Sequence, residues 1–172
     1  SGSLITNLTA QDKQTLTKKY TENPEAYRAY IRGRTLLDMR NQENREQAAG
    51  EFPQALRLDP GFGLAYTGLA DTFSATGNSR SGEEAKAAYI KAKFYAEKSL
   101  ELDPDSAEGH TSRGRLKRIH DWDWDGAEKD FERAIALNPN YATAHFFYAQ
   151  MLSFLGRHDE AIAEIDRAAE IN

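Results

Sequence analysis

The stretch AHFFYAQMLSFLGRHDEAI at residues 144–162, which follows Pro139, decides how this chain folds. Ala144 and Ala149 are small residues in a helix-forming run of mainly aromatic side chains. Gly156 comes where that run should stop, because glycine accepts the left-handed backbone that ends many helices. A second helical run follows directly. The stretch therefore predicts two helices joined by a tight turn.

The same arrangement recurs along the chain and is marked by proline. Four of the five prolines close an Asn-Pro or Asp-Pro pair before a helical stretch, namely Pro24, Pro60, Pro104 and Pro139. These prolines are 36, 44 and 35 residues apart, and 33 residues follow the last one. Such a period is typical of stacked two-helix units. The chain is therefore predicted to be a repeat array that recognises a partner with a surface, rather than a protein with chemistry in a pocket.

The second helix of each unit carries small and large residues in a fixed order. Spacings of four and three residues place a small, a large and a small side chain on one helix face. The alanines let a neighbouring helix approach, and the larger residue fills the groove between them. The three sets are Ala48, Phe52 and Ala55; Ala127, Phe131 and Ala134; and Ala161, Ile165 and Ala168.

Together these positions resemble the tetratricopeptide repeat family, most clearly at residues 144–162. The resemblance covers residues 23–172 and implies an all-α, right-handed superhelical solenoid of antiparallel helix pairs. The expected units are residues 24–59, 60–103, 104–138 and 139–172. Residues 1–22 are expected to hold a tag remnant, Ser1-Gly2-Ser3, and a short helix capped by Thr9.

Two features should make the units unequal in shape. The second unit is about ten residues longer than its neighbours. The excess predicts a loop near residues 78–84 and a long helix over residues 83–102 that projects by about two turns. Pro53 lies in the middle of the first unit's second helix and should kink or break it near Ala49.

Individual residues also depart from the repeat. Arg34 stands where the other units have a small residue, and Arg113 replaces a large apolar one. We expect looser packing at both places. Gly77 is expected, like Gly156, to end a first helix in the left-handed conformation.

Composition limits the classes of function. The net charge of -5 comes from interspersed acids and bases, so no basic stripe is available for nucleic acid. No apolar run is long enough to cross a membrane. The absence of cysteine excludes disulfides and thiolate sites and is compatible with a cytoplasmic location.

One segment has the spacing of a calcium loop. Asp121, Asp123, Asp125 and Gly126, with Glu132, satisfy the EF-hand pattern. A calcium loop must stay coiled around the ion, however, and a repeat helix is expected to begin near Asp125. We therefore expect the two intervening tryptophans to pack the turn and Asp125 to cap the helix. Micromolar calcium binding in a calorimetric titration would support the alternative.

No catalytic motif is present in the sequence. His110 and His145 occupy equivalent positions in two units, which favours a structural role for both. Metalloprotease, phosphate-loop and nucleophile-elbow motifs are missing. We expect no enzymatic activity, no cofactor and no metal.

The resemblance also implies where a partner would bind. First-helix residues that point away from the second helices should line a concave groove. Arginines and phenylalanines there would suit a peptide with acidic residues and an apolar anchor. The alternative is a face that is merely solvated. The expected groove residues are Arg28, Arg32, Thr35, Thr67, Asp71, Thr111, Arg115, Arg118, Phe147, Gln150 and Phe154.

Chaperone-binding members of the family hold a terminal carboxylate with lysines and asparagines. The corresponding positions here are Ile31, Thr35, Gly68, Glu108 and Ser112, so that clamp is not expected.

Two functions from different classes follow. The first is a protein-interaction module that binds a peptide or partner domain. The second is a structural or regulatory module that self-associates, or docks onto an attached effector domain, through the last helix. That helix has apolar residues on two faces, which suggests that the natural array continues or pairs there. Residues 18–34 and 120–124 resemble the repeat region of multidomain bacterial signalling proteins, including adenylate cyclases, serine/threonine kinases and winged-helix regulators.

Overall fold

The computed structural model describes residues 20–39 and 41–171, and these ranges contain eight α-helices, one π-helical turn and no strand. The predicted helix that starts at Thr9 lies outside the described residues. The elements are α2 (Pro24–Asp38), α3 (Gln42–Leu58), α4 (Gly63–Asn78), α5 (Gly82–Leu102), α6 (Ala107–Leu116), η1 (Lys117–Asp121), α7 (Trp124–Leu137), α8 (Ala142–Phe154) and α9 (His158–Ile171).

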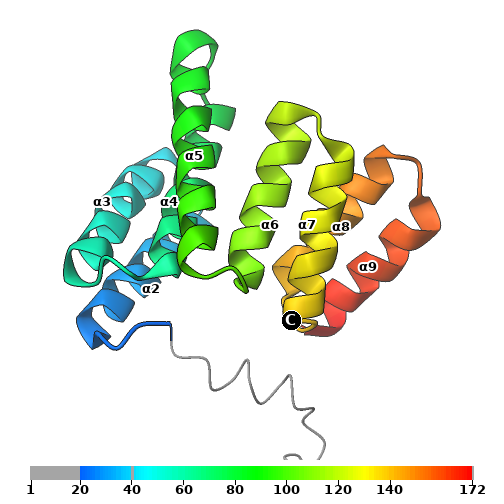
Figure 1. The fold of residues 1–172 in the computed structure, drawn as a ribbon. Helices are drawn as coiled ribbons and strands as arrows, with labels where there is room; N and C mark the ends of the chain where they lie inside the picture. Colours follow the sequence, from blue (N-terminus) through cyan, green and yellow to red (C-terminus); the bar gives the residue numbers. More distant parts are fainter. Residues whose placement is uncertain (1–19, 40, 172) are drawn as a thin grey trace, which may run out of the picture.

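The helices pack as consecutive antiparallel pairs that stand side by side. Packing is most extensive within the pairs α2 and α3, α4 and α5, α6 and α7, and α8 and α9. Figure 1 shows the pairs following one another from α2 and α3 on one side to α8 and α9 on the other. The predicted all-α solenoid of antiparallel helix pairs is confirmed.

The Asn-Pro and Asp-Pro pairs serve both ends of the helices. Asn23 caps α2, where its side chain accepts hydrogen bonds from the backbone N–H groups of Glu25 and Ala26, and Pro24 is the first helical residue. Asp59 instead closes α3 with a backbone N–H bonded to the Ala55 carbonyl, and α4 begins only at Gly63. An Asn-Pro or Asp-Pro pair can thus close the preceding helix or cap the start of the following one.

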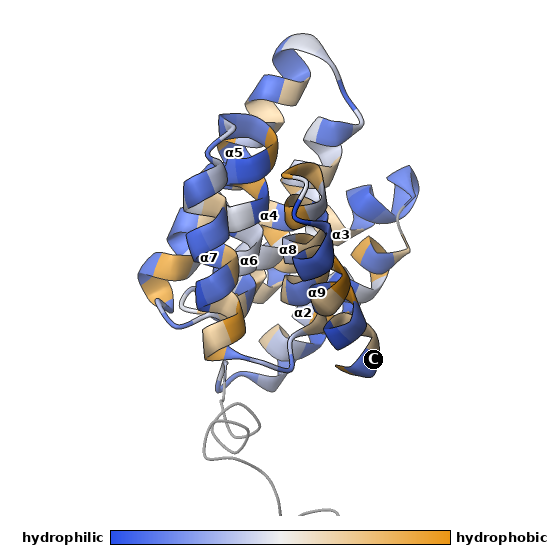
Figure 2. Cartoon of the chain, turned by 90° about the vertical axis from the view of Figure 1, so that its right-hand side faces the viewer, coloured by the Kyte–Doolittle hydropathy of each residue, from blue (hydrophilic) through white to orange (hydrophobic). Residues whose placement is uncertain are grey.

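The small and large pattern forms the interior of the solenoid. Ala48, Phe52 and Ala55 are fully buried, and the corresponding three residues of α7 are fully buried as well. The last set differs, because Ile165 remains 40% exposed. Among the described helices α9 packs mainly on α8, and Figure 2 shows both apolar and polar segments on this helix.

The two expected helix-ending glycines behave differently. Gly156 has a φ of 77°, as predicted for a left-handed helix end. Gly77 lies inside α4 and is not among the glycines with positive φ, so that prediction is wrong. Glycine is needed at position 77 for another reason: a Cβ there would collide with the ring of Tyr89 on α5.

The long second unit has the predicted shape. Helix α5 has 21 residues and extends beyond its neighbours, as Figure 1 shows. Pro53, by contrast, does not break its helix, since α3 runs from Gln42 to Leu58 through the proline. The carbonyl that loses its N–H donor belongs to Ala49, and both Ala49 and Pro53 are only half-buried.

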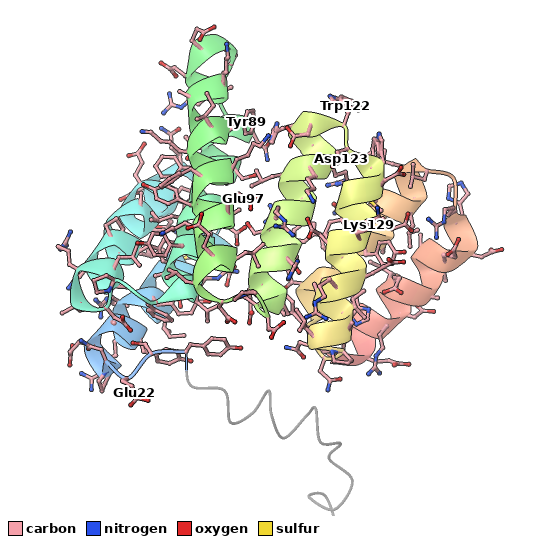
Figure 3. All side chains as sticks on the ribbon, viewed as in Figure 1. Glu22, Tyr89, Glu97, Trp122, Asp123 and Lys129 are labelled. Atoms are coloured by element: carbon pink, nitrogen blue, oxygen red, sulfur yellow. The ribbon has the colours of Figure 1, made fainter. Side chains whose placement is uncertain are left out.

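The turn around the two tryptophans is built from a π-helical segment and one strained residue. Segment η1 ends at Asp121 and is followed by Trp122, which has a φ of 55° and is 71% exposed. Asp123, not Asp125, caps α7 by accepting a hydrogen bond from the Gly126 N–H at 2.9 Å. Figure 3 shows Trp122 and Asp123 at the connection between α6 and α7. Glu132 lies well inside α7, so residues 121–132 do not coil around an ion site.

Candidate functional site

A groove of about 950 Å³ is formed by the first helices of all four pairs together with parts of α3 and α9. Its lining combines three arginines and two aspartates with aromatic and small apolar residues. The lining residues are Arg34, Leu37, Asp38, Arg45, Asp71, Ala75, Asn78, Ser79, Arg115, Ala142, Thr143, Phe146, Phe147, Gln150, Ile165, Ala168 and Ala169.

Asp71 on α4 links three helices within this groove. Its Oδ2 accepts a hydrogen bond from Arg34 Nη1 at 2.8 Å, and its Oδ1 accepts one from Arg115 Nη1 at 3.0 Å. The Ser112 hydroxyl also donates to Oδ1, at 2.9 Å. Burial alone would lower the pKa of Arg34, but the Asp71 carboxylate together with Tyr30 and Tyr141 outweighs burial and raises it. A single carboxylate therefore holds two guanidinium groups in place.

Two arginines of the α6 and η1 segment lie over phenylalanines of α8. The Arg115 guanidinium is 4.1 Å from the ring centroid of Phe147, and the Arg118 guanidinium is 5.6 Å from that of Phe154. Both distances suit cation–π contact. Arg118 Nη2 also approaches Gln150 Oε1 at 3.4 Å. Gln150 belongs to the groove lining, so its contact with Arg118 places Arg118, and Phe154 next to it, beside the groove along α8.

Six of the expected groove residues thus lie together. Asp71, Arg115, Phe147 and Gln150 line the groove, and the contacts of Gln150 and Phe154 place Arg118 beside them. Arg118 is only 9% exposed, whereas Phe154 is 75% exposed.

The other expected residues lie elsewhere. Arg28 pairs with Glu25 on the exposed side of α2, and Arg32 Nε donates to Glu51 of α3 at 3.0 Å. Thr35 donates to the carbonyl of Ile31, while Thr67 and Thr111 are buried and bond to Ser99 and to the Ala107 carbonyl, respectively. None of these five residues contributes to the groove lining.

Sequence reasoning missed several lining residues. Arg34 was noticed only as a departure from the repeat, yet it is the partner of Asp71 in the next helix pair. A charged residue at a normally small position, with an acid in the next unit, was the available signal. Phe146 and Ile165 were missed because their exposure depends on how α8 and α9 pack, which a single repeat does not reveal.

His110 and His145 take equivalent structural roles, as expected. In each, Nε2 lies 3.0 Å from the carbonyl oxygen of the proline that opens its unit. Nδ1 of His110 meets Asp130 at 3.0 Å, and Nδ1 of His145 meets Glu164 at 2.6 Å. Each imidazole therefore ties the turn before its first helix to the second helix.

The buried Asp130 is the centre of a cluster of basic side chains from α6 and η1. Its carboxylate accepts from Arg113 Nε at 2.9 Å and Nη2 at 2.6 Å, and Lys117 Nζ lies at 2.8 Å. Burial would raise the pKa of Asp130, but hydrogen bonds from His110, Arg113 and Lys117 outweigh it and hold the pKa below its usual range. Hydrogen bonds and an ion pair with Asp130 therefore hold Arg113 at a position where other units have an apolar residue.

Residues 20–39 and 41–171 contain no cluster of three or more side chains suited to holding a metal ion. Within the same ranges, none of the helices has the length and apolar character that spanning a bilayer requires.

These features define an all-α repeat solenoid with a concave groove. Residues 123–172 match the family model of the tetratricopeptide repeat, a fold that is generally a non-catalytic interaction scaffold. The match covers residues 123–172, and solved structures of such repeat proteins share the all-α fold of this chain. A comparison with curated proteins gives no match.

Several solved structures share the fold. TTC0263, a thermophilic TPR protein of Thermus thermophilus, is 22% identical with a TM-score of 0.73, over 86% of this chain and 74% of that one. A MamA protein is 22% identical with a TM-score of 0.52, over 86% and 73%. MamA from Desulfovibrio magneticus, from its residue 41 onward, is 16% identical with a TM-score of 0.55, over 94% and 81%.

Proposed function

We propose that this chain is a non-catalytic protein-interaction module that binds a peptide or a partner domain in the concave groove. The observation that carries this proposal is the groove itself, to which the first helices of all four pairs contribute. A surface built from every pair offers a partner a long, continuous and rigid contact. The tetratricopeptide repeat fold supports the same function.

The chemistry of the lining indicates the kind of partner. Arginine and aromatic side chains provide most of the energy in protein interfaces. The lining holds three arginines against two aspartates, although the whole chain is negative. We therefore infer an acidic peptide with an apolar anchor that packs near Phe146 and Phe147.

Two exposed phenylalanines provide a matched test. Phe146 is 37% exposed in the groove, and Phe94 is 63% exposed on α5, outside the lining. A library of capped twelve-residue peptides would be selected against the wild-type chain. For the enriched peptides, Phe146→Ala should weaken binding about tenfold or more, whereas Phe94→Ala should leave it unchanged. No enrichment, or an equal loss for both variants, would refute the proposal.

We further propose that the module belongs to a larger bacterial signalling protein. The support is the resemblance of residues 18–34 and 120–124 to the repeat region of such proteins. Translation of the complete parent gene tests it, since a cyclase, kinase or winged-helix domain in the same reading frame is expected. A parent gene without an effector domain would contradict it.

A second candidate function is self-association, or docking onto an attached domain, through α9. Ile162 and Ile165 on this helix are 58% and 40% exposed. Two such faces could pair and bury them. Light scattering should then show a mass that rises with concentration and returns to the monomer value in Ile162→Glu. A monomer at every concentration would exclude self-association, but not docking within one chain.

A further inference from the structure

Arg118 is a buried cation that has no anionic partner in residues 20–39 and 41–171. Its side chain belongs to η1 and is only 9% exposed. Among the residues that the structure describes, no carboxylate lies within ion-pair distance of it. Its one hydrogen bond is the 3.4 Å contact with Gln150, and its buried Nε has no partner in that part of the chain.

Nearby charge adds to this imbalance. Burial, and then the neighbouring Arg115, lower the pKa of Arg118. Arg115 shares Asp71 with Arg34, and its own Nε is likewise buried without a partner among the described residues. The local carboxylate is therefore already occupied. Buried charges in proteins are normally paired, because losing water without gaining a partner is unfavourable.

The surroundings of Arg118 are suited to a ligand. Gln150 connects it to the groove, and the ring of Phe154 lies beside the same guanidinium with 75% of its surface exposed. A guanidinium presents parallel N–H donors that match the two oxygens of a carboxylate. An apolar side chain next to that carboxylate would cover the exposed ring.

We infer that Arg118, together with Arg115, forms an oxyanion subsite at the α8 end of the groove that receives a side-chain carboxylate of an acidic peptide. The adjacent apolar residue of the peptide packs on Phe154. This inference rests on the proposed function and specifies the ligand chemistry of the same groove. The subsite differs from the clamp that chaperone-binding repeat proteins use for a terminal carboxylate. In this chain the positions of that clamp are occupied by Ile31, Thr35, Gly68, Glu108 and Ser112.

The test uses capped twelve-residue peptides enriched by the wild-type chain, each compared with a copy in which every glutamate is glutamine. The wild-type chain should bind the glutamate form about tenfold more tightly. Arg118→Gln should remove most of this preference, and Arg118→Lys should keep part of it. The matched control is Arg133→Gln on α7, whose exposed side chain pairs with Asp105, and it should keep the full preference.

Each result separates the subsite from the groove. Binding without a preference for glutamate, or a preference unchanged in Arg118→Gln, overturns the subsite and leaves the proposed function intact. No enriched peptide overturns both. Inorganic phosphate serves as a second probe. Free phosphate at micromolar concentration could protect the Arg118 Nε signal in NMR while no peptide shows a preference for glutamate. The ligand would then be a small anion rather than a peptide carboxylate, and the inference would be overturned.

Stability provides an independent readout. If Arg118 is kept for binding, Arg118→Leu should fold with an unchanged or higher Tm while losing the preference for glutamate. A Tm lowered by more than about 4 °C would indicate a structural role and count against the subsite.

Discussion

The α6 and η1 segment carries two groups of basic side chains, one toward α7 and one toward the groove, and only the first has a full set of partners among the described residues. Toward α7, His110, Arg113 and Lys117 surround Asp130. Toward the groove, Arg115 shares a carboxylate, and Arg118 has none among the described residues. Charges inside a helix pair are therefore balanced by the fold itself. Charges on the concave side are left for a ligand to balance.

The largest expected effect is on the balanced face. Asp130→Asn removes the charge that pairs with Arg113 and Lys117, and the free energy of unfolding should fall by about 2–3 kcal/mol. Urea denaturation would measure it. The exposed Asp125 of the same helix is the matched control, and Asp125→Asn should change stability by less than about 0.5 kcal/mol. Equal losses in both variants would remove the distinction between the two faces.

The two arginines should respond in opposite ways to the same substitution. Arg113→Leu leaves Asp130 short of two hydrogen bonds and should destabilise the fold by about 2 kcal/mol. Arg118→Leu removes a cation that no carboxylate of the described residues holds, so stability should stay equal or rise. Urea denaturation of both variants would measure the difference. A similar loss of stability in both would show that Arg118 is held as firmly as Arg113.

Lowering the pH should remove the stability that Asp130 contributes through its partners on α6 and η1. The native pKa of Asp130 lies below its ordinary value of 3.8. A depressed native pKa contributes stability that is fully present above the unfolded-state value and disappears as the pH falls through it toward the native one. The Tm should therefore fall less steeply between pH 5 and pH 2 for Asp130→Asn than for the wild-type chain. Parallel curves would contradict the role assigned to Asp130.

The smallest expected effect concerns the shared carboxylate of the groove. Asp71→Asn frees Arg34 and Arg115 from a negative charge and should tighten binding of the enriched acidic peptides about threefold. Stability should fall by about 1 kcal/mol, since the amide oxygen still accepts hydrogen bonds. Fluorescence titration measures the affinity. Weaker binding would mean that Asp71 positions the arginines more than it neutralises them.

Much of the architecture was predictable because it depends on local rules. The proline period gave the number of helix pairs, and the alanine and phenylalanine spacing gave the buried face of α3 and α7. Gly156 and the long α5 were predicted from single residues and from chain length. Gly77 was misread because a glycine signals either a left-handed turn or a close contact, and the contact with Tyr89 comes from another helix.

The groove was predictable only in part. Asp71, Arg115, Phe147 and Gln150 follow from their helix positions, whereas Arg34 was identified only as an exception. Arg32 has similar chemistry to Arg34 but turns toward Glu51 on α3. Side chains two residues apart on a helix point to different faces of it. Which of these faces meets a neighbouring helix depends on how the helix pairs pack.

The repeat, most helix ends and the apolar faces could be predicted from the chain, because period, capping and small-residue spacing act within one or two helices. Which charges have partners depends on how the helix pairs stack. Arg113 and Arg118 lie five residues apart, yet one meets Asp130 and the other meets Phe154 and Gln150. Partners so far apart in the chain are brought together only when the pairs stack, and that stacking leaves Arg118 buried and without a carboxylate among the described residues.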